Sequence, residues 1–315
     1  MKRSLILAAV ATLTSGAALA QSSVTVYGRL NTSLERQKNI TSADNVWVLQ
    51  NNGSRLGFKG VEDLGGGMKA GFVLEHRFNI DNGASTNGTS FWGGAGTSEV
   101  YLGGNFGTVR LGHFTSEAYF ATSDYTDLLN HGTGTSSDAL YKYLGNDNNK
   151  IAYRAPAFGP VTLEGAVSLG EGPTGNRIID LAANYAGGPL AAGFGYEKVQ
   201  DGDSQFGFRG AYEFGAALVT GYVQRYTNEA ADSSKTIWRL SGMYTMGLTE
   251  LHAAYGAAGE LESNGVVLEE KTKQYTFGAN YNLSKRTKLF AFYNRVKADS
   301  TDAASAVALG VRHNF

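Results

Sequence analysis

The sequence predicts an all-β fold, a 16-stranded antiparallel transmembrane β-barrel. Three observations predict it: alternating polar and apolar residues recur along the chain, short and long connections alternate between these segments, and most segments have one polar face. The 315 residues include 42 glycines, 17 tyrosines, 16 phenylalanines, four prolines and no cysteine. So many aromatic residues argue against disorder, and residues 21–315 contain no apolar run long enough for a transmembrane helix.

The first twenty residues have the features of a secretory signal peptide. Lys2 and Arg3 form a positive start, Ser4–Ala11 an apolar core, and Ala18–Ala20 a cleavage site of small residues. We expect residues 21–315 to form one barrel domain. Cleavage would reduce the 27 basic residues to 25 against 28 acidic ones, a net charge of −3, so nucleic acid is not an expected partner.

Period-2 patterning defines the strands in order, and the last one ends on the bare aromatic residue Phe315. The sixteen predicted strands cover residues 23–36, 46–61, 67–80, 96–105, 107–113, 148–156, 160–169, 177–187, 189–199, 204–214, 216–227, 235–246, 249–259, 271–283, 286–297 and 305–315.

The connections between these strands fall into two classes. Tight turns, rich in glycine or other turn-forming residues, occur at residues 62–67, 104–107, 157–159, 186–188, 214–216, 246–249 and 282–286. Longer polar segments occur at residues 37–45, 81–95, 115–147, 259–270 and 298–304. Short turns on one rim and long loops on the other are typical of barrels in bacterial outer membranes.

The two faces of the strands differ in polarity. Ile179 and Leu181 alternate with Asp180, and Phe277 alternates with Thr276. Sixteen tilted strands close at a backbone radius of roughly 16 Å, too wide for side chains to fill. Because an apolar lining around empty space is unfavourable, we expect the polar face to line water and the apolar face to meet lipid.

Several motifs carry a resemblance to a known family: SSVTVYG at residues 22–28, SRLGFKGVEDLGGGMKAGF at 54–72, GNFGTVRLG at 104–112, YNLSKRT at 281–287 and GVRHNF at the C-terminus. Together they resemble the general porins of beta-proteobacteria, of the neisserial type. The resemblance implies a homotrimer in the outer membrane, with the third long loop folded into the lumen. It also implies passive diffusion of ions and small hydrophilic solutes, contact with outer-membrane lipid and lipopolysaccharide, and no catalysis.

A constriction is expected where the long segment at residues 114–147 meets the wall. Such a long connection is usually functional or disordered, and its acidic residues Glu117, Asp124, Asp127 and Asp138 outnumber its single lysine, Lys142. The inward positions of the wall are expected to carry Arg29, Arg55, Lys59, Arg77, Arg110, Lys150 and Arg312. Acids opposite bases would create a transverse field that sorts solutes by size, polarity and charge.

Two further interpretations concern these charges. The basic residues could instead be solvated, or pair with inward acids such as Glu75 and Glu99. Anion-selective relatives carry extra basic residues at two places. This chain has Thr97 and Ser98 at the first place and Asn146-Asp147-Asn148-Asn149 at the second. A strong anion preference is therefore not expected.

Alternative functions need features of other kinds. A solute-specific porin would use the loop residues Tyr119, Phe120 and Tyr125 as a binding track for sugars, and an adhesin or structural barrel would have a plugged lumen. A barrel hydrolase would need a histidine such as His131 near a serine or an acid. The five histidines are scattered without a metal-binding motif, so no metal, cofactor or enzymatic activity is expected.

Overall fold

The structure is a computed structural model that describes residues 23–86, 91–92, 96–129, 139–145, 148–171 and 175–315. The expected signal peptide at residues 1–20 lies outside the described residues. Among the residues that are described, none of the helices has both the length and the apolar character needed to cross a membrane.

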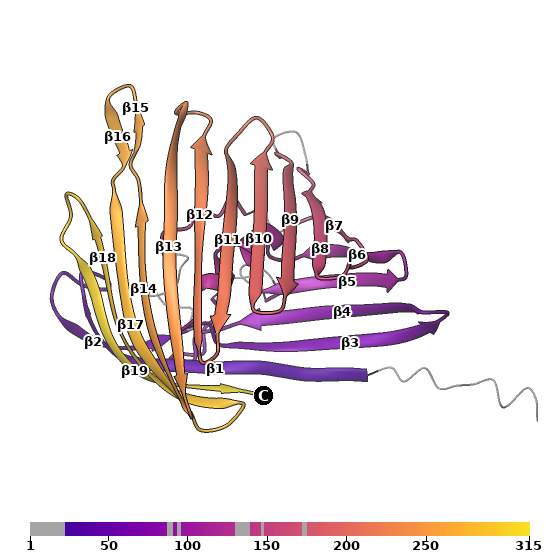
Figure 1. Cartoon of the computed structure of the whole chain (residues 1–315), viewed down its shortest axis with the longest axis horizontal. Coiled ribbons are helices and arrows are strands. Elements are labelled where there is room, and N and C mark those ends of the chain that lie inside the picture. Colours follow the sequence, from indigo (N-terminus) through magenta and orange to yellow (C-terminus); the bar gives the residue numbers. More distant parts are fainter. Residues whose placement is uncertain (1–22, 87–90, 93–95, 130–138, 146–147, 172–174) are drawn as a thin grey trace, which may run out of the picture.

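Seventeen strand segments form one antiparallel sheet that closes into a barrel (Figure 1). They are β1 (Ser23–Lys38), β2 (Val46–Asn51), β3 (Arg55–Gly65), β4 (Met68–Arg77), β5 (Thr97–Gly104), β6 (Gly107–His113), β7 (Lys150–Arg154), β8 (Val161–Ser168), β9 (Ile178–Gly187), β10 (Leu190–Val199), β11 (Ser204–Phe214), β12 (Ala217–Asn228), β13 (Ser233–Met246), β14 (Thr249–Ala258), β17 (Thr272–Asn282), β18 (Thr287–Ala298) and β19 (Ala304–Asn314). Closure occurs between β1 and β19, where Gly28 and Phe315 also exchange backbone hydrogen bonds of 3.0 and 3.1 Å.

The predicted strand at residues 46–61 is interrupted, which explains seventeen segments in a barrel of sixteen wall strands. Both halves, β2 and β3, pair with β1. At the break Gly53 has a φ of 73°, and the Ser54 hydroxyl accepts a 3.0 Å hydrogen bond from the backbone N–H of Asn31. The Asn31 side chain donates to the carbonyl of Asn52 at 2.8 Å. These side-chain bonds add to a backbone bond that remains at the break, from the N–H of Asn52 to the carbonyl of Asn31 at 2.9 Å.

The two rims of the barrel differ as the sequence predicts. Gly188, Gly215 and Gly247 have φ near 60° in the tight turns after β9, β11 and β13, a conformation that favours glycine. The longer connections lie at the other end, which Figure 1 shows for the hairpin of β15 (Leu261–Ser263) and β16 (Val266–Glu269). We refer to these ends as the short-turn rim and the long-loop rim.

The polarity of the wall is inverted relative to that of a water-soluble protein. Ile179 and Leu181 are 47% and 44% exposed on the outer face, whereas Asp180 between them is 2% exposed. On β17 the outward Phe277 is 53% exposed, and the inward Thr276 is buried. The apolar residues therefore face outward, as expected for a barrel surrounded by lipid.

Two of the long connections contain structure that the sequence patterning does not predict. The hairpin β15–β16 turns at Asn264 and Gly265, whose φ values of 52° and 77° suit a two-residue hairpin turn. The segment after β6 contains the helix α2 (Glu117–Ala121) and the 3₁₀ helix η1 (Asp124–Thr126). The Ser116 side chain caps α2 by accepting a hydrogen bond from the N–H of Tyr119, so five residues suffice for a helical turn.

Candidate functional site

Five basic side chains form one row on the polar face of five neighbouring strands. This row, the basic ladder, consists of Arg77 (β4), Arg55 (β3), Arg29 (β1), Arg312 (β19) and Lys288 (β18). Arg55 is directly opposite both Arg77 and Arg29, and Arg312 is directly opposite Lys288. Arg29 and Arg312 are diagonal neighbours, because Arg29 is opposite Asn314. Because five cations are neighbours, positive potential is concentrated in this sector of the wall. The neighbouring like charges also repel one another.

Carboxylates compensate only part of the ladder. Glu75 lies between two arginines, 3.6 Å from Nε of Arg55 and 3.3 Å from Nε of Arg77, and it also accepts a 3.3 Å hydrogen bond from the Tyr27 hydroxyl. Glu250 lies 3.4 Å from Nζ of Lys288. Nε of Arg29 is buried and has no hydrogen-bond partner among the described residues. The centre of the ladder is thus its least compensated part.

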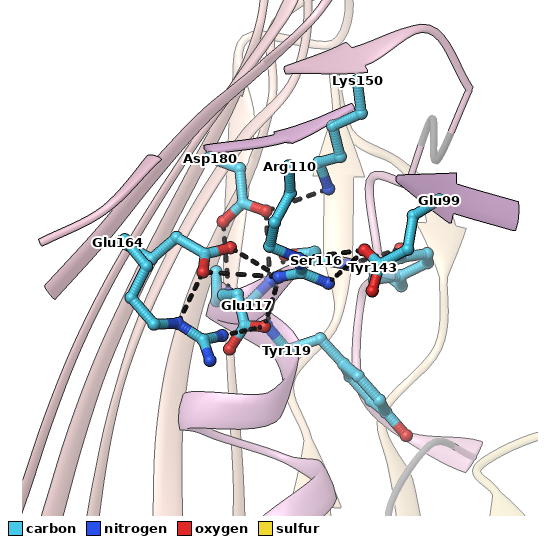
Figure 2. A network of polar contacts seen from close by, with 11 residues as sticks. Glu99, Arg110, Ser116, Glu117, Tyr119, Tyr143, Lys150, Glu164 and Asp180 are labelled. Atoms are coloured by element: carbon cyan, nitrogen blue, oxygen red, sulfur yellow. Dashed lines mark hydrogen bonds and ion pairs between the residues drawn. The ribbon is translucent and has the colours of Figure 1, made fainter. Parts of the chain in front are cut away.

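A second network surrounds Arg110 and fixes α2 to the wall (Figure 2). The Arg110 guanidinium lies 2.9 Å from Glu99, 2.9 Å from Glu117 and 3.0 Å from Glu164. Arg154 also contacts Glu117 at 2.7 Å and Glu164 at 2.8 Å. Arg110 therefore connects β5, β6 and β8 to the first residue of α2, and its charge is matched by acids.

Both ends of α2 have charged partners on the wall. Asp180 on β9 accepts hydrogen bonds from the backbone N–H groups of Glu117 and Ala118 at 3.2 and 3.1 Å, and Lys150 lies 3.1 Å from the same carboxylate. At the other end Arg209 on β11 donates to the carbonyl of Ala121 at 2.7 Å. Acid at the start and base at the end match the polarity of the helix backbone.

Glycines on the polar face of β10 allow the helix to approach the wall. A Cβ atom on Gly193 would overlap the carbonyl oxygen of Ala121, and one on Gly195 would lie 2.5 Å from the carbonyl oxygen of Ala118. Because no other residue lacks a Cβ, these two positions set how closely α2 can lie against β10.

Other described residues of the segment contact the polar face elsewhere in the barrel. Leu129 packs with the buried residues Phe290 and Phe292, and Tyr141 packs with Tyr222 and Ile237. Beside Tyr141, Lys142 lies 2.7 Å from Glu269 of the β15–β16 hairpin, which also binds Lys235 at 2.7 Å.

The remaining predicted site residues occupy different environments. Asp127 lies close enough for its charge to act on Arg312, and Asp124 accepts a 3.5 Å hydrogen bond from Tyr119. Lys59 is four residues along β3 from Arg55, about 13 Å towards the short-turn rim, with its ammonium 5.3 Å from the centre of the Tyr27 ring. Asp138 and His131 lie outside the described residues.

The aromatic residues of the segment divide into two groups. Tyr119 packs against Tyr141 and Tyr143, with ring centres 5.6 Å apart in both cases. Phe120 is 41% exposed, and so is Tyr125, whose ring lies 3.8 Å from the guanidinium of Arg209.

Sequence reasoning did not select several residues that build these sites. Lys288, Asp180 and Arg209 are inward charges, but their neighbours depend on strand register, which the sequence does not give. The G-x-G pattern of Gly193 and Gly195 was a usable signal, since glycines at two successive inward positions mark the close approach of another backbone.

Comparison with known proteins agrees with this architecture. Residues 7–301 match the family model described as Gram-negative porin. The chain is 30% identical over its whole length to outer membrane porin protein 32 of Delftia acidovorans. It is also 25% identical to the major outer membrane protein P.IB of Neisseria meningitidis, over the full length of both chains.

Solved structures show the same fold. The anion-selective porin from Comamonas acidovorans superposes with a TM-score of 0.76 at 27% identity, covering 94% of this chain and 100% of that one. A loop-deletion mutant of OmpT from Vibrio cholerae, at 19% identity and a TM-score of 0.72, shares the fold. The chain therefore belongs to the Gram-negative porin family, whose members are outer-membrane channels and not enzymes.

Proposed function

We propose that this porin favours anions, and that its constriction lies between the basic ladder and the segment at residues 114–147. The general function is that of an outer-membrane channel for passive diffusion. The finer proposal depends on one observation, the continuous cross-strand row of Arg77, Arg55, Arg29, Arg312 and Lys288.

Counting the charges near the ladder supports the sign of the preference. Three carboxylates act on its five cations: Glu75, Glu250 and Asp127. Arg110 and Lys150 are matched by Glu99, Glu117, Glu164 and Asp180. In this proposal the ladder attracts anions, and the Arg110 network holds α2 in place.

The position of the segment supports a constriction. Residues 116–129 contact polar-face residues of β9, β10, β11 and β18, which lie opposite the exposed apolar face. Asp127 near Arg312 would give the transverse field across the opening. Polar solutes would exchange hydration for charged contacts there, and apolar solutes would disrupt the oriented water.

The name of one solved relative supports the same preference. A porin that superposes on this chain at 27% identity is named anion-selective. We propose a moderate anion preference, because Thr97, Ser98 and Asn146–Asn149 stand where anion-selective relatives have additional basic residues.

We also propose that the chain is exported through a signal peptide at residues 1–20, assembles as a homotrimer and contacts lipopolysaccharide.

Reversal potentials in a salt gradient test the ion preference. Purified wild-type protein in a planar phospholipid bilayer should give a reversal potential of the sign expected for anions. Replacing Arg55 and Arg77 by glutamine should shift it towards the cation value, and Arg225→Gln, an outward residue, should leave it unchanged. An unchanged potential in the double variant would contradict the proposed role of the ladder.

A further inference from the structure

The outer surface of the barrel has a groove across β7, β8, β9 and β10. Its volume is about 680 Å³, and most of its walls are apolar. Gly165 on β8 lies directly between Tyr153 on β7 and Leu181 on β9, so the missing side chain leaves a hollow between two large outward residues. A groove in the lipid-facing surface can hold an acyl chain.

The long-loop end of the same groove is polar and basic. Arg177, Lys198 and Gln200 line this end, and the N–H of Gln200 donates to the carbonyl of Arg177 at 2.8 Å. Arg177 is exposed and forms no ion pair with any described residue. Lys198 donates to the carbonyl of Gly202 at 2.7 Å and lies 3.2 Å from the exposed Glu229.

The groove is thus polar at one end and apolar along its length. From Arg177 the outward positions continue through Ile179 to Leu181, about 13 Å along the strand. Val167 lies directly opposite Ile179, one step nearer the long-loop rim than Gly165. This order matches an amphiphile with an anionic headgroup at the rim and an acyl chain along the strands.

The long-loop ends of the other wall strands carry outward charges of the same sign. Among the described residues, their outward positions carry cations and no carboxylate: Arg36, Lys38, Arg225, Lys273, Arg295 and Lys297. Long loops of bacterial outer-membrane barrels face the cell exterior, so this rim lies in the outer leaflet. Clustered Lys and Arg residues at a membrane surface attract anionic lipid headgroups.

We propose that the groove at Gly165 binds a phosphorylated, multiply acylated lipid of the outer leaflet, with a phosphate at Arg177 and Lys198 and one acyl chain between Tyr153 and Leu181. This site gives a location to the proposed contact with lipopolysaccharide, and it rests on that proposal. Glu229 competes with the phosphate for Lys198. A second copy of the chain is a poorer occupant, because the outward rim positions of its described wall strands carry cations and no carboxylate that could pair with Arg177 and Lys198.

Native mass spectrometry of the detergent-solubilised full chain with added bisphosphorylated lipid A tests the site. The wild type should retain one lipid per chain more strongly than a dephosphorylated analogue, and millimolar inorganic phosphate should not displace it. Arg177→Gln should weaken retention about tenfold, Gly165→Leu should weaken it by filling the hollow, and Glu229→Gln should strengthen it. Arg225→Gln is the matched control, because Arg225 is a rim cation that bonds Thr236 and Ser234 outside the groove.

The result that overturns the site is unchanged retention in both Arg177→Gln and Gly165→Leu. Equal retention of the dephosphorylated lipid would also overturn it, as would a change of oligomeric state in Gly165→Leu with lipid retention intact. Reversal potentials are measured separately, in phospholipid bilayers without lipid A. A negative result for the lipid site therefore does not affect the test of the proposed ion preference.

Discussion

Arg29 and Glu75 have opposite effects on the basic ladder. Arg29 lies between Arg55 and Arg312 and adds a partly buried positive charge, whereas Glu75 is the carboxylate between Arg55 and Arg77. We predict that Arg29→Gln lowers the anion preference while preserving or raising resistance to thermal unfolding, because it relieves like-charge repulsion.

Glu75→Gln should have the opposite effects on anion preference and on thermal stability. Removing this carboxylate leaves two arginines without their shared partner, so anion preference should rise and stability should fall by about 1–3 kcal/mol. Reversal potentials and thermal unfolding followed by circular dichroism measure both changes. Reversal potentials that shift in the same direction in Arg29→Gln and Glu75→Gln would show that the ladder does not control ion selectivity.

The glycines beneath α2 give a prediction about pore size. Gly193→Ala would place a methyl group where the carbonyl oxygen of Ala121 lies, so α2 must move away from β10. We predict an altered single-channel conductance with the barrel still folded. Gly210→Ala on the next strand is the control, since an added Cβ there has no neighbour within 4 Å. Equal conductance in both variants would contradict the placement of α2.

At the level of elements, a carboxylate links the segment after β6 to the hairpin β15–β16. Burial opposes ionisation of Glu269, but hydrogen bonds from Lys142 and Lys235 outweigh it and lower the pKa of this carboxyl. Since the folded-state pKa lies below the ordinary value, the link is intact at neutral pH and is lost as the pH falls through the lowered pKa.

Single-channel recordings should therefore become noisier in acid, as Tyr141 and Lys142 loosen. Glu269→Gln should show this noise already at neutral pH and lose the dependence on pH. Glu270→Gln should keep the wild-type profile, because Glu270 bonds Ser300 and not the segment. Identical pH profiles in all three proteins would exclude the link as a restraint.

The wall strands could be predicted from sequence because period-2 patterning is a local property. Ile179, Asp180 and Leu181 show their faces without knowledge of any partner strand. The break at Gly53 could not be predicted in this way, because it depends on hydrogen bonds from Asn31 on another strand. Helix α2 was missed for a similar reason, since Asp180 and Arg209, which hold its ends, lie 62 or more residues away in sequence.

The candidate site was predictable in composition but not in arrangement. Inward arginines such as Arg29 and Arg312 follow from parity alone. That they form one row with Lys288, while Arg110 joins a separate network with Glu99, depends on the register of strands distant in sequence. Residue types thus indicated a charged lumen, and closure of the barrel determined which charges are neighbours.

At the scale of the whole molecule, passage of ions requires a barrel whose polar face lines water and whose apolar face meets lipid. Arg312 and Val311 are adjacent on β19 and point to opposite faces, and Val311 is 41% exposed on the outside. The chain contains no cysteine, so single cysteines introduced at these positions can be labelled without background.

The most direct test is the change in bilayer current when a membrane-impermeant, negatively charged thiol reagent is added to Arg312→Cys and to Val311→Cys. We predict a prompt change in conductance and a shift away from anion preference in Arg312→Cys, with no change in Val311→Cys. A response from Val311→Cys and none from Arg312→Cys would contradict the assignment of the two faces.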